Sequence, residues 1–328
     1  MATTLADIAR LAGVSTAAVS LALNDKKGVS PETRDRILAI VEETGYRVNR
    51  LGRALRQSRT GSVGLYMPNS AIHFGYYTET TLGVAETLHR HDRSLLILPS
   101  AAQHPKIDSF PPVDGYILVE PHSDDQGVRA ILEQELPVVS GDRPGSDFPP
   151  PWGVVESPNR SSTRAAFDRF LAGGAERPGL ILLERLSAWA RELESAYREW
   201  AAERGLTPRV TVISIHQSNE EITELLGDWF APGSGCDAVL AGGDGIAVRI
   251  AGILRALGHR VGEDVRLISG VDGPLMAFHT PRITAIDLQP RAFGRACAEL
   301  LLELLDAPRS PEPVRRLIEA PLVARESG

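Results

Sequence analysis

The chain is poor in cysteine: only Cys236 and Cys297 occur among its 328 residues. Two isolated cysteines are too few for a disulfide framework or a cysteine-based metal cluster. No run of about 18 apolar residues occurs, so no segment is predicted to span a membrane. The opening residues MATTLADIAR lack the basic start and apolar stretch of a secretory signal. These absences favour a folded protein of a reducing cytoplasm.

Motifs of catalysis are lacking as well. The Gly-rich stretch AGGDGIA (241–247) has neither the Lys-Ser/Thr of a phosphate-binding loop nor the G-x-G-x-x-G spacing. His89 and His91 lie two residues apart on an expected helix, so their rings point apart and form a poor metal site. No histidine has an evident Ser or Cys partner in a nucleophilic motif. We therefore expect no enzymatic activity, no metal site and no cofactor.

Charge is distributed unevenly along the chain. The first 60 residues hold 10 Lys or Arg and 6 Asp or Glu, a net charge of +4, whereas the rest hold 25 and 36, a net charge of −11. A basic N-terminal segment on an acidic body indicates that this segment alone meets a polyanion. A chance fluctuation of surface charge would produce the same imbalance.

Three short helices are predicted in the basic segment. Thr4 and Asp7 are placed to cap a first helix, and Gly13 supplies the turn that follows it. Ser15 can cap a second helix, and the pair Ser30-Pro31 opens a third. The expected inward-facing residues are Leu5, Ile8, Ala9 and Ala12, then Val19 and Leu23, then Ile37, Leu38, Ile40 and Val41.

The stretch GVSTAAVSLALN (13–24) completes a helix, a turn with glycine and a second short helix. This order is the helix-turn-helix pattern of DNA-binding proteins. Small alanines would let the second helix approach DNA closely, while hydroxyl and amide groups bond to phosphates. A three-helix bundle without a ligand is the alternative.

The segment TLADIARLAGVSTAAVSLALN, followed by VSPETRDRILAIVEETGYRVNRLGRALR and GSVGLYMP, resembles the lactose-repressor (LacI/GalR) family of bacterial transcription regulators. The family pattern is close to T-x-x-D-V-A-x-x-A-G-V-S-x-x-T-V-S-x-x-L-N, then V-S-x-x-T-R-x-x-V, then G-Y-x-P-N-x-x-A-R-x-L. Nearly every element has a counterpart here. The similarity continues more weakly to the final PLVARESG, which resembles the closing strand of that family.

The resemblance implies roles for single residues of the second helix. Leu21 departs from the Arg of well-known members, and Ala18 from the usual Thr. Arg reads guanine through two hydrogen bonds, worth about 1–3 kcal/mol of discrimination, whereas Leu contacts only apolar groups such as a thymine methyl. We therefore predict that the base pair opposite Leu21 is not read as guanine. By the resemblance, the residues that read bases are Thr16, Ala17 and Leu21, and those that touch phosphate and sugar are Ser15, Ser20 and Asn24.

The stretch NRLGRALRQSRTG (49–61) resembles the family's hinge, a short helix that pairs with its dimer mate and inserts a Leu into the minor groove. Leu55 occupies the wedge position, and Arg50, Arg53 and Arg56 surround it. Gly52 stands where Ala is common and lowers helix propensity by about 1 kcal/mol. The hinge is therefore predicted to be helical only on the operator. A basic flexible linker is the alternative.

After residue 61, apolar strand-like runs alternate with helical ones, which predicts parallel sheets with right-handed crossovers. The strand-like runs are SVGLYM, SLLIL, DGYILV and LPVVS in one series, and PGLILL, RVTVISI, CDAVLA and DVRLIS in a second. The helices are expected near 77–91, 124–135, 160–173, 187–204, 219–230 and 245–257, and RITAID with a helix over 292–305 returns the chain to the first series.

The fold class that follows is α/β, with an all-α helix-turn-helix head and, by the resemblance, a periplasmic-binding-protein-like body of two subdomains with parallel sheets. The expected bounds are 1–48 for the head, 49–60 for the hinge and 61–328 for the body. Within the body, we expect one subdomain over 61–159 with 290–318, and the other over 160–289 with 319–328.

The resemblance places an effector in the cleft between the subdomains, and clefts at the carboxyl ends of strands are the usual sites in such sheets. It puts Asp142 and Asp272 at ligand-binding positions, where carboxylates suit the hydroxyl donors of a sugar. Asn69, Ser70 and Tyr77 follow the first strand and are further candidates. Two loop-capping aspartates would give the same pattern.

Two positions depart from the sugar-binding members. Leu193 stands where an effector-binding Arg is usual, and Gly243 stands where Asn is usual. The loss of both polar groups argues against a simple sugar as the effector.

We therefore predict a cytoplasmic, sequence-specific transcription regulator, expected to act as a repressor. A homodimer would bind a pseudo-palindromic operator in double-stranded DNA, and a small-molecule effector, a sugar or related polar metabolite, would shift its affinity. No leucine heptads follow the final strand, which favours a dimer over a tetramer. A small-molecule binding protein without a DNA-regulatory role is the competing hypothesis, against which the basic head and the missing signal peptide speak.

Overall fold

The computed structural model describes residues 3–23, 27–46, 59–68, 74–100, 110–183, 185, 187–231 and 235–328. The chain separates into two compact units, Met1–Thr60 and Gly61–Gly328. None of the described helices is by itself long and apolar enough to cross a membrane; Leu5–Ala12 and Thr16–Leu23 meet that requirement only as a pair bent by 101°.

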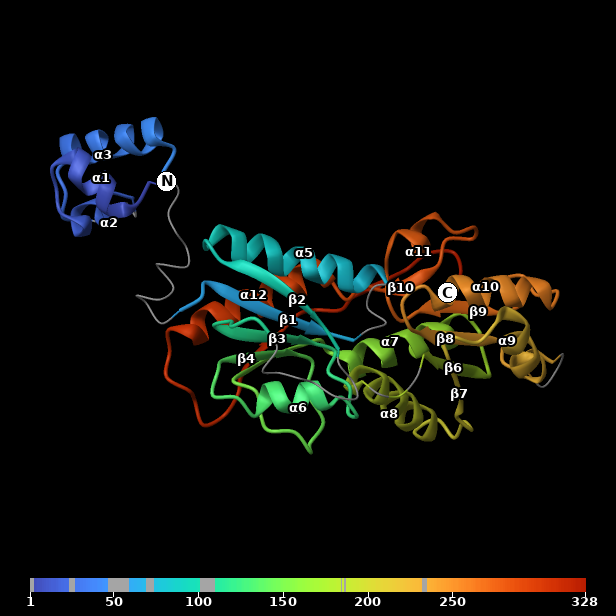
Figure 1. Ribbon diagram of the computed structural model, residues 1–328. Helices are drawn as coiled ribbons and strands as arrows, with labels where there is room; N and C mark the ends of the chain where they lie inside the picture. Colours follow the sequence, from blue (N-terminus) through green and yellow to red (C-terminus); the bar gives the residue numbers. More distant parts are fainter. Residues whose placement is uncertain are drawn as a thin grey trace. The chain divides into compact units, whose positions relative to one another are not determined.

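The described residues of the first unit form three helices, as predicted (Figure 1). Thr4 and Asp7 cap the first helix reciprocally, and Gly13 ends it in the left-handed conformation with φ 65°. Ser30 accepts a hydrogen bond from the amide of Thr33 at the start of the third helix. The helices are α1 (Leu5–Ala12), α2 (Thr16–Leu23) and α3 (Pro31–Thr44).

The core of this unit is narrow. The prediction that Leu38 faces inward is wrong, because its side chain is 43% exposed. Only one stripe of α3 faces the other two helices, and Ile37 fills it, while Ile40 and Val41 pack partly against it. On α2, Ala22 is buried, whereas Leu23 is only partly so. The buried residues are Ile8, Ala9, Ala12, Val19, Ala22 and Ile37.

The second unit is built on two six-stranded sheets. The first sheet has the order β11-β5-β4-β3-β1-β2 and is parallel throughout. The second has the order β12-β10-β9-β8-β6-β7 and is parallel except for β12, which runs antiparallel to β10. The strands of the first sheet are β1 (Ser62–Met67), β2 (Ser94–Pro99), β3 (Gly115–Val119), β4 (Val138–Gly141), β5 (Gly153–Glu156) and β11 (Val314–Leu317). Those of the second are β6 (Pro178–Leu183), β7 (Arg209–Ile213), β8 (Ala238–Gly242), β9 (Arg266–Ser269), β10 (Thr284–Ile286) and β12 (Leu322–Val323).

Helices cover both faces of each sheet (Figure 1). Because side chains alternate along a strand, Ile117 and Val119 of β3 pack toward α5 and α12, whereas Tyr116 and Leu118 pack toward α6. The first sheet carries α5 (Gly75–Arg90) and α12 (Pro290–Leu305) on one face and α6 (Gln126–Leu132) on the other. The second carries α7 (Asn159–Ala172) and α8 (Ala188–Ala202) on one face, and α9 (Asn219–Leu226) and α10 (Ile246–Ala256) on the other, with the short α11 (Pro274–Phe278) beyond.

Several bounds differ from the sequence-based expectation. The helix expected over 124–135 is limited to α6, and the one expected over 219–230 ends at Leu226, followed by the 3-10 turn η3 (Asp228–Phe230). Strands β5 and β11 were not predicted. Both have four residues, and β11 carries Arg315 and Arg316 in place of an apolar run.

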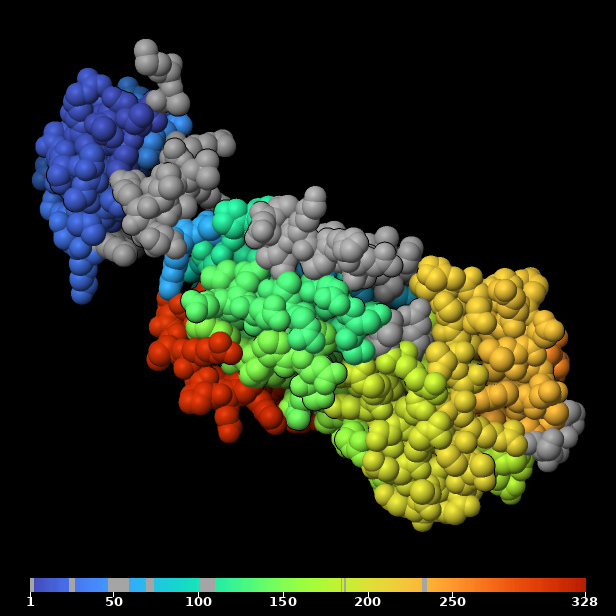
Figure 2. Space-filling view, turned by 60° about the horizontal axis from the view of Figure 1, so that its bottom comes forward, coloured from blue at the N-terminus to red at the C-terminus, as the bar shows by residue number. Residues whose placement is uncertain are grey.

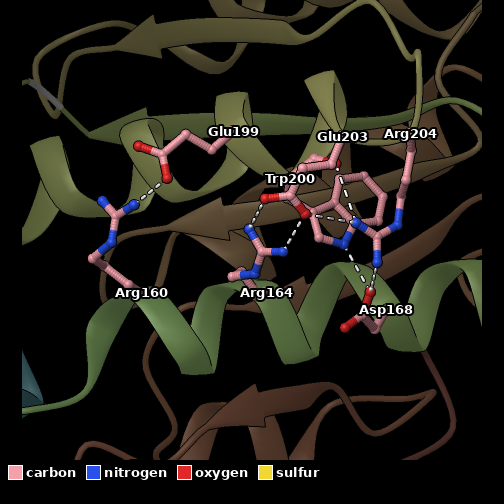
Figure 3. A network of polar contacts seen from close by, with 7 residues as sticks. All are labelled: Arg160, Arg164, Asp168, Glu199, Trp200, Glu203 and Arg204. Carbon is pink, nitrogen blue, oxygen red and sulfur yellow. Dashed lines mark hydrogen bonds and ion pairs between the residues drawn. The ribbon is translucent and has the colours of Figure 1, made fainter.

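A row of polar contacts joins α7 and α8 (Figure 3). Asp168 accepts hydrogen bonds from Trp200 Nε1 at 2.7 Å and from the guanidinium of Arg204 at 2.8 Å. Residues four apart lie on one side of a helix, so the ion pairs repeat along the two helices. The other two pairs in the row are Arg160 with Glu199 and Arg164 with Glu203.

The chain passes between the sheets three times: after β5, between β10 and α12, and between β11 and β12. We call the first sheet with α5, α6 and α12 the first subdomain, and the second sheet with α7 to α11 the second subdomain. An isolated antiparallel bridge between His122 and Ser187 joins them. The green surface of the first subdomain and the yellow surface of the second adjoin each other in Figure 2.

Candidate functional site

Helix α2 is set at a sharp angle to α1 by a short turn. Gly13, Val14 and Ser15 separate the two helices, whose axes are bent by 101°. The hydroxyl of Ser15 accepts a hydrogen bond from the amide of Ala18 at 3.2 Å, which caps α2 as predicted. An angle of about 90–120° and a turn with glycine are the geometry of a DNA-binding helix-turn-helix.

The outer side of α2 is small and uncharged. Val19 and Ala22 are buried against the other helices, which leaves Thr16, Ala17 and Ser20 exposed and Leu21 half-buried. No acidic or basic residue lies in the first or last turn of α2. The predicted base-reading residues therefore share one accessible side of one helix, which a groove of DNA can approach closely.

Several predicted site residues lie outside the described residues. They are Asn24, Arg50, Arg53, Leu55 and Arg56 of the DNA-binding set, and Asn69 and Ser70 of the effector set.

A cleft that is open to solvent lies between the two subdomains. Its walls come from the carboxyl ends of strands in both sheets, where ligands bind in folds of this kind. Its floor includes Ser157, Asn159 and Leu288, which lie where the chain crosses between the sheets. The other lining residues are Phe74, Tyr76, Tyr77, Glu120, His122, Asp142, Leu183, Ser187, Trp189, Ile215, Gly243, Asp244 and Val271.

Asp142 and Tyr77 line this cleft, as the resemblance implied. Asp142 has a left-handed backbone with φ 66°, and its N–H donates to the carbonyl of Val155 at 2.8 Å. Burial, reinforced by the carboxylates of Glu120 and Glu192, raises the pKa of Asp142 to about 8. At neutral pH this carboxyl group therefore holds a proton in the ligand-free protein.

Asp272, in contrast, is not among the lining residues. Its two carboxylate oxygens accept hydrogen bonds from the guanidinium of Arg325, each at 2.8 Å. Both side chains are 14% exposed. This two-point ion pair joins the loop after β9 to the C-terminal segment.

Asp244 connects the two subdomains at the edge of the cleft. Its Oδ2 accepts a hydrogen bond from the backbone N–H of Tyr76 at 2.9 Å, in the first turn of α5. A carboxylate at a helix N-terminus is favoured by the helix dipole. Burial raises the pKa of Asp244, while the N–H groups of Tyr76, Gly75 and Gly245 oppose that rise.

The two departures from the sugar-binding pattern differ in position. Leu193 is buried with Phe167 and Tyr197 in the core of the second subdomain, outside the cleft. Gly243 does line the cleft, but a Cβ there would come within 2.9 Å of Ile246. A larger side chain at this position would force its neighbours to shift.

Most of the polar and aromatic residues that line the cleft were not predicted from the sequence. Glu120 directly follows the apolar run GYILV, and Asp244 closely follows AVLAG, so their positions after buried strands could have identified them. Glu120 accepts a hydrogen bond from the hydroxyl of Tyr77. Trp189, at the start of α8, gave no comparable signal.

A helix-turn-helix unit in one chain with a two-subdomain ligand-binding body defines a class of DNA-binding regulators that respond to small molecules. Residues 4–49 match the profile described as bacterial regulatory proteins, lacI family, and residues 167–328 match a periplasmic binding protein-like domain. The transcriptional regulator CelR of Thermobifida fusca is 30% identical over 339 aligned residues, which cover 99% of this chain and 98% of that protein. The chain belongs to the LacI family, and it is a DNA-binding transcription regulator rather than an enzyme.

Other relatives agree with this assignment. The sucrose operon repressor of Klebsiella pneumoniae is 28% identical, with 98% of each chain covered. Among solved structures, the complex of CelR with cellobiose matches with a TM-score of 0.72 and 27% identity over 99% of this chain and 100% of that one. The Lac repressor dimer bound to operator and the anti-inducer ONPF matches with a TM-score of 0.81 over 100% and 99%. At 20% identity, this last likeness concerns the fold alone.

Proposed function

We propose that this protein is a homodimeric, cytoplasmic repressor whose operator affinity is controlled by a small molecule bound in the cleft. The single observation that carries the proposal is the small, uncharged outer side of α2 on a capped helix-turn-helix, in one chain with the cleft. Thr16, Ala17 and Leu21 would face base edges in the major groove. Ser15, Ser20 and Asn24 would contact the backbone.

The last part of the first unit would act as the hinge. We propose residues 1–48 as the head, 49–60 as the hinge and 61–328 as the body. Leu55 would enter the minor groove, with Arg50, Arg53 and Arg56 against the phosphates. Unstacking a base step costs a few kcal/mol, which contacts to kinked DNA offset.

Effector control would work through the relation between the subdomains. A ligand shifts an equilibrium only by its different affinities for the two states, and the cleft is lined by both subdomains. The relative CelR, which has been solved in complex with cellobiose, and the sucrose operon repressor support a sugar or related polar metabolite as effector. Asp142, Tyr77, Asn69 and Ser70 are the proposed contacts; Asp272 would act through its ion pair with Arg325.

The test is a selection of genomic fragments by the purified full-length protein, followed by salt-dependent gel shifts. We expect a pseudo-palindromic site whose affinity falls steeply with salt, because bound phosphates release counterions. Capture of no fragment at low ionic strength would leave the competing hypothesis, a binding protein without a DNA role.

The selected site also tests the role of Leu21. The base pair opposite Leu21 should not require guanine, whereas Leu21→Arg should create a guanine preference of about 1–3 kcal/mol. An obligatory guanine at that position in the wild type contradicts this assignment.

A further inference from the structure

The cleft is rich in hydrogen-bond acceptors and poor in positive charge. Glu120, Asp142 and Asp244 all line it, and none of the described lining residues is Lys or Arg. The nearest guanidinium of the Asp142 loop, that of Arg143, is paired with Glu156 at 2.6 Å. The walls therefore present an excess of negative or acceptor groups to whatever enters.

A buried acceptor lacks a partner in the same place. Asn159 is 4% exposed and lines the cleft. Its Nδ2 donates to Glu192 Oε2 at 3.1 Å, and its Oδ1 has no hydrogen-bond partner among the described residues. A buried acceptor without a partner costs free energy, and a donor from a ligand would satisfy this atom.

Aromatic rings complete the cleft. Tyr76 and Tyr77 pack edge to face with centroids 5.3 Å apart, and Phe74 and Trp189 line the same space. Aromatic faces attract cations through their quadrupole, most strongly where water is excluded. They also pack against the apolar faces of sugar rings.

We propose that the ligand of this cleft carries a protonated amine on a polyhydroxylated frame, as an amino sugar does. This inference rests on the proposed effector site and narrows its ligand class. An ammonium group supplies three donors and one positive charge, which match the orphan acceptor of Asn159 and the three carboxyl groups. Phosphorylated sugars and sugar acids fit less well, because their anionic groups would face these carboxyl groups with no Lys or Arg among the described lining residues.

The three carboxyl groups differ in the hydrogen bonds that they accept from the protein. Asp244 accepts the N–H of Tyr76, and Glu120 accepts the hydroxyl of Tyr77. Asp142 faces the carboxylates of Glu120, Glu192 and Glu156, with the side chain of Asn159 as its hydrogen-bonding neighbour. Asp142 is therefore the group that would ionise when an ammonium enters.

That ionisation gives the binding reaction a measurable signature. Burial and the neighbouring carboxylates raise the pKa of Asp142 to about 8, so the group is protonated in the empty cleft below that pH. A bound ammonium would lower this pKa. Binding of the amine should therefore release about one proton per site, whereas a neutral sugar should release none.

The test compares three disaccharides of the same linkage with the full-length protein. The β-1,4-linked glucosamine disaccharide carries amines, N,N′-diacetylchitobiose carries neutral amides, and cellobiose carries hydroxyls at the same carbons. Calorimetry at about pH 6, where the sugar amine is protonated, should show the glucosamine disaccharide binding at least about tenfold more tightly than the other two. The heat of binding of the glucosamine disaccharide should change with the ionisation enthalpy of the buffer, because the buffer takes up the released proton.

Variants separate the charge effect from folding. Asp142→Asn should abolish both the amine preference and the proton release, while Glu199→Gln, on α8 outside the cleft, should keep both. Equal or tighter binding of cellobiose overturns the inference, and so does a failure of the glucosamine disaccharide and of glucosamine itself to bind at millimolar concentration. None of these outcomes touches the operator-binding proposal, whose failure would show in the DNA selection alone.

Discussion

The two units of the chain bury their side chains in different ways. Among its described residues, the first unit encloses six buried apolar residues, three of them alanines, in one small cluster. In the second unit, helices cover both faces of two sheets, and the largest buried side chains include Tyr66, Trp200 and Phe167. Small domains bury a lower fraction of their surface and are correspondingly marginal. The unit that carries α2 is thus expected to be the less stable of the two.

The same contrast applies to function. On α2 the residues proposed to bind DNA are exposed or half-buried, and the buried ones pack against the other helices. In the cleft the residues proposed to bind the ligand are themselves partly or fully buried, so ligand binding and stability are expected to depend on the same side chains. Substitutions should therefore separate stability from function in the first unit and couple them in the second.

The largest effect is expected from Ile37→Ala. Ile37 is fully buried in the small cluster, and truncation to Ala typically costs about 2–5 kcal/mol. Hydrogen exchange of α1, α2 and α3 should then lose protection throughout. Leu38→Ala, at the neighbouring exposed position, should cost about 1 kcal/mol or less. Ile117→Ala in the first sheet should leave protection of the three helices unchanged; a joint loss would contradict the separation of the units.

A smaller effect is expected from Ala17→Asp on operator affinity. Ala17 is exposed on α2, so the variant should fold, but its carboxylate would meet phosphates and base edges. We expect a loss of about tenfold to a hundredfold in gel-shift titrations. Ala39→Asp, exposed on α3, makes the same change in net charge as a control. Equal losses in the two variants would mean that α2 is not the recognition helix.

Asp142 should give the body a pH dependence. Its pKa of about 8 exceeds the ordinary 3.8, so the folded state holds the proton more tightly than the unfolded chain. The free energy of unfolding should therefore fall as pH rises from about 4 to about 8, by about 2 kcal/mol after screening by water in the cleft. Asp142→Asn should flatten this part of the profile in chemical denaturation. Identical slopes in the two proteins would place the titration elsewhere.

The smallest effect is expected from Arg160→Ala in the row between α7 and α8. Arg160 and Glu199 have side chains 47% and 52% exposed, and exposed ion pairs contribute about 0.2–1 kcal/mol. A double-mutant cycle with Glu199→Ala measures the pair itself. A coupling well above that range would show that the row of Figure 3 acts as a network.

Local signals made the helical unit predictable in detail. Thr4 with Asp7, Gly13, Ser15 and the pair Ser30-Pro31 are short-range capping patterns, and each forms as expected. The prediction for Leu38 was wrong for a physical reason. Periodicity identifies the apolar side of a helix, but only tertiary packing determines how much of that side the other helices cover.

Long-range contacts limited prediction in the body. Asp272 forms an ion pair with Arg325, 53 residues further along the chain. No local sequence pattern reveals this contact. Strand β11 is held in the sheet by its backbone pairing with β5 rather than by an apolar run. Conversely, Glu120 and Asp244 could have been found from their positions after predicted strands, because parallel strands bring their carboxyl ends together.

Two of the three passages between the sheets, the one after β5 and the one between β10 and α12, contribute residues to the lining of the cleft. Ser157, Asn159 and Leu288 are at once parts of these passages and of its lining. A rotation of one subdomain relative to the other has to change a few backbone torsion angles in the segments that connect them. A ligand bound to these residues would contact the connecting segments directly. Its size and shape would therefore determine the angle between the two subdomains.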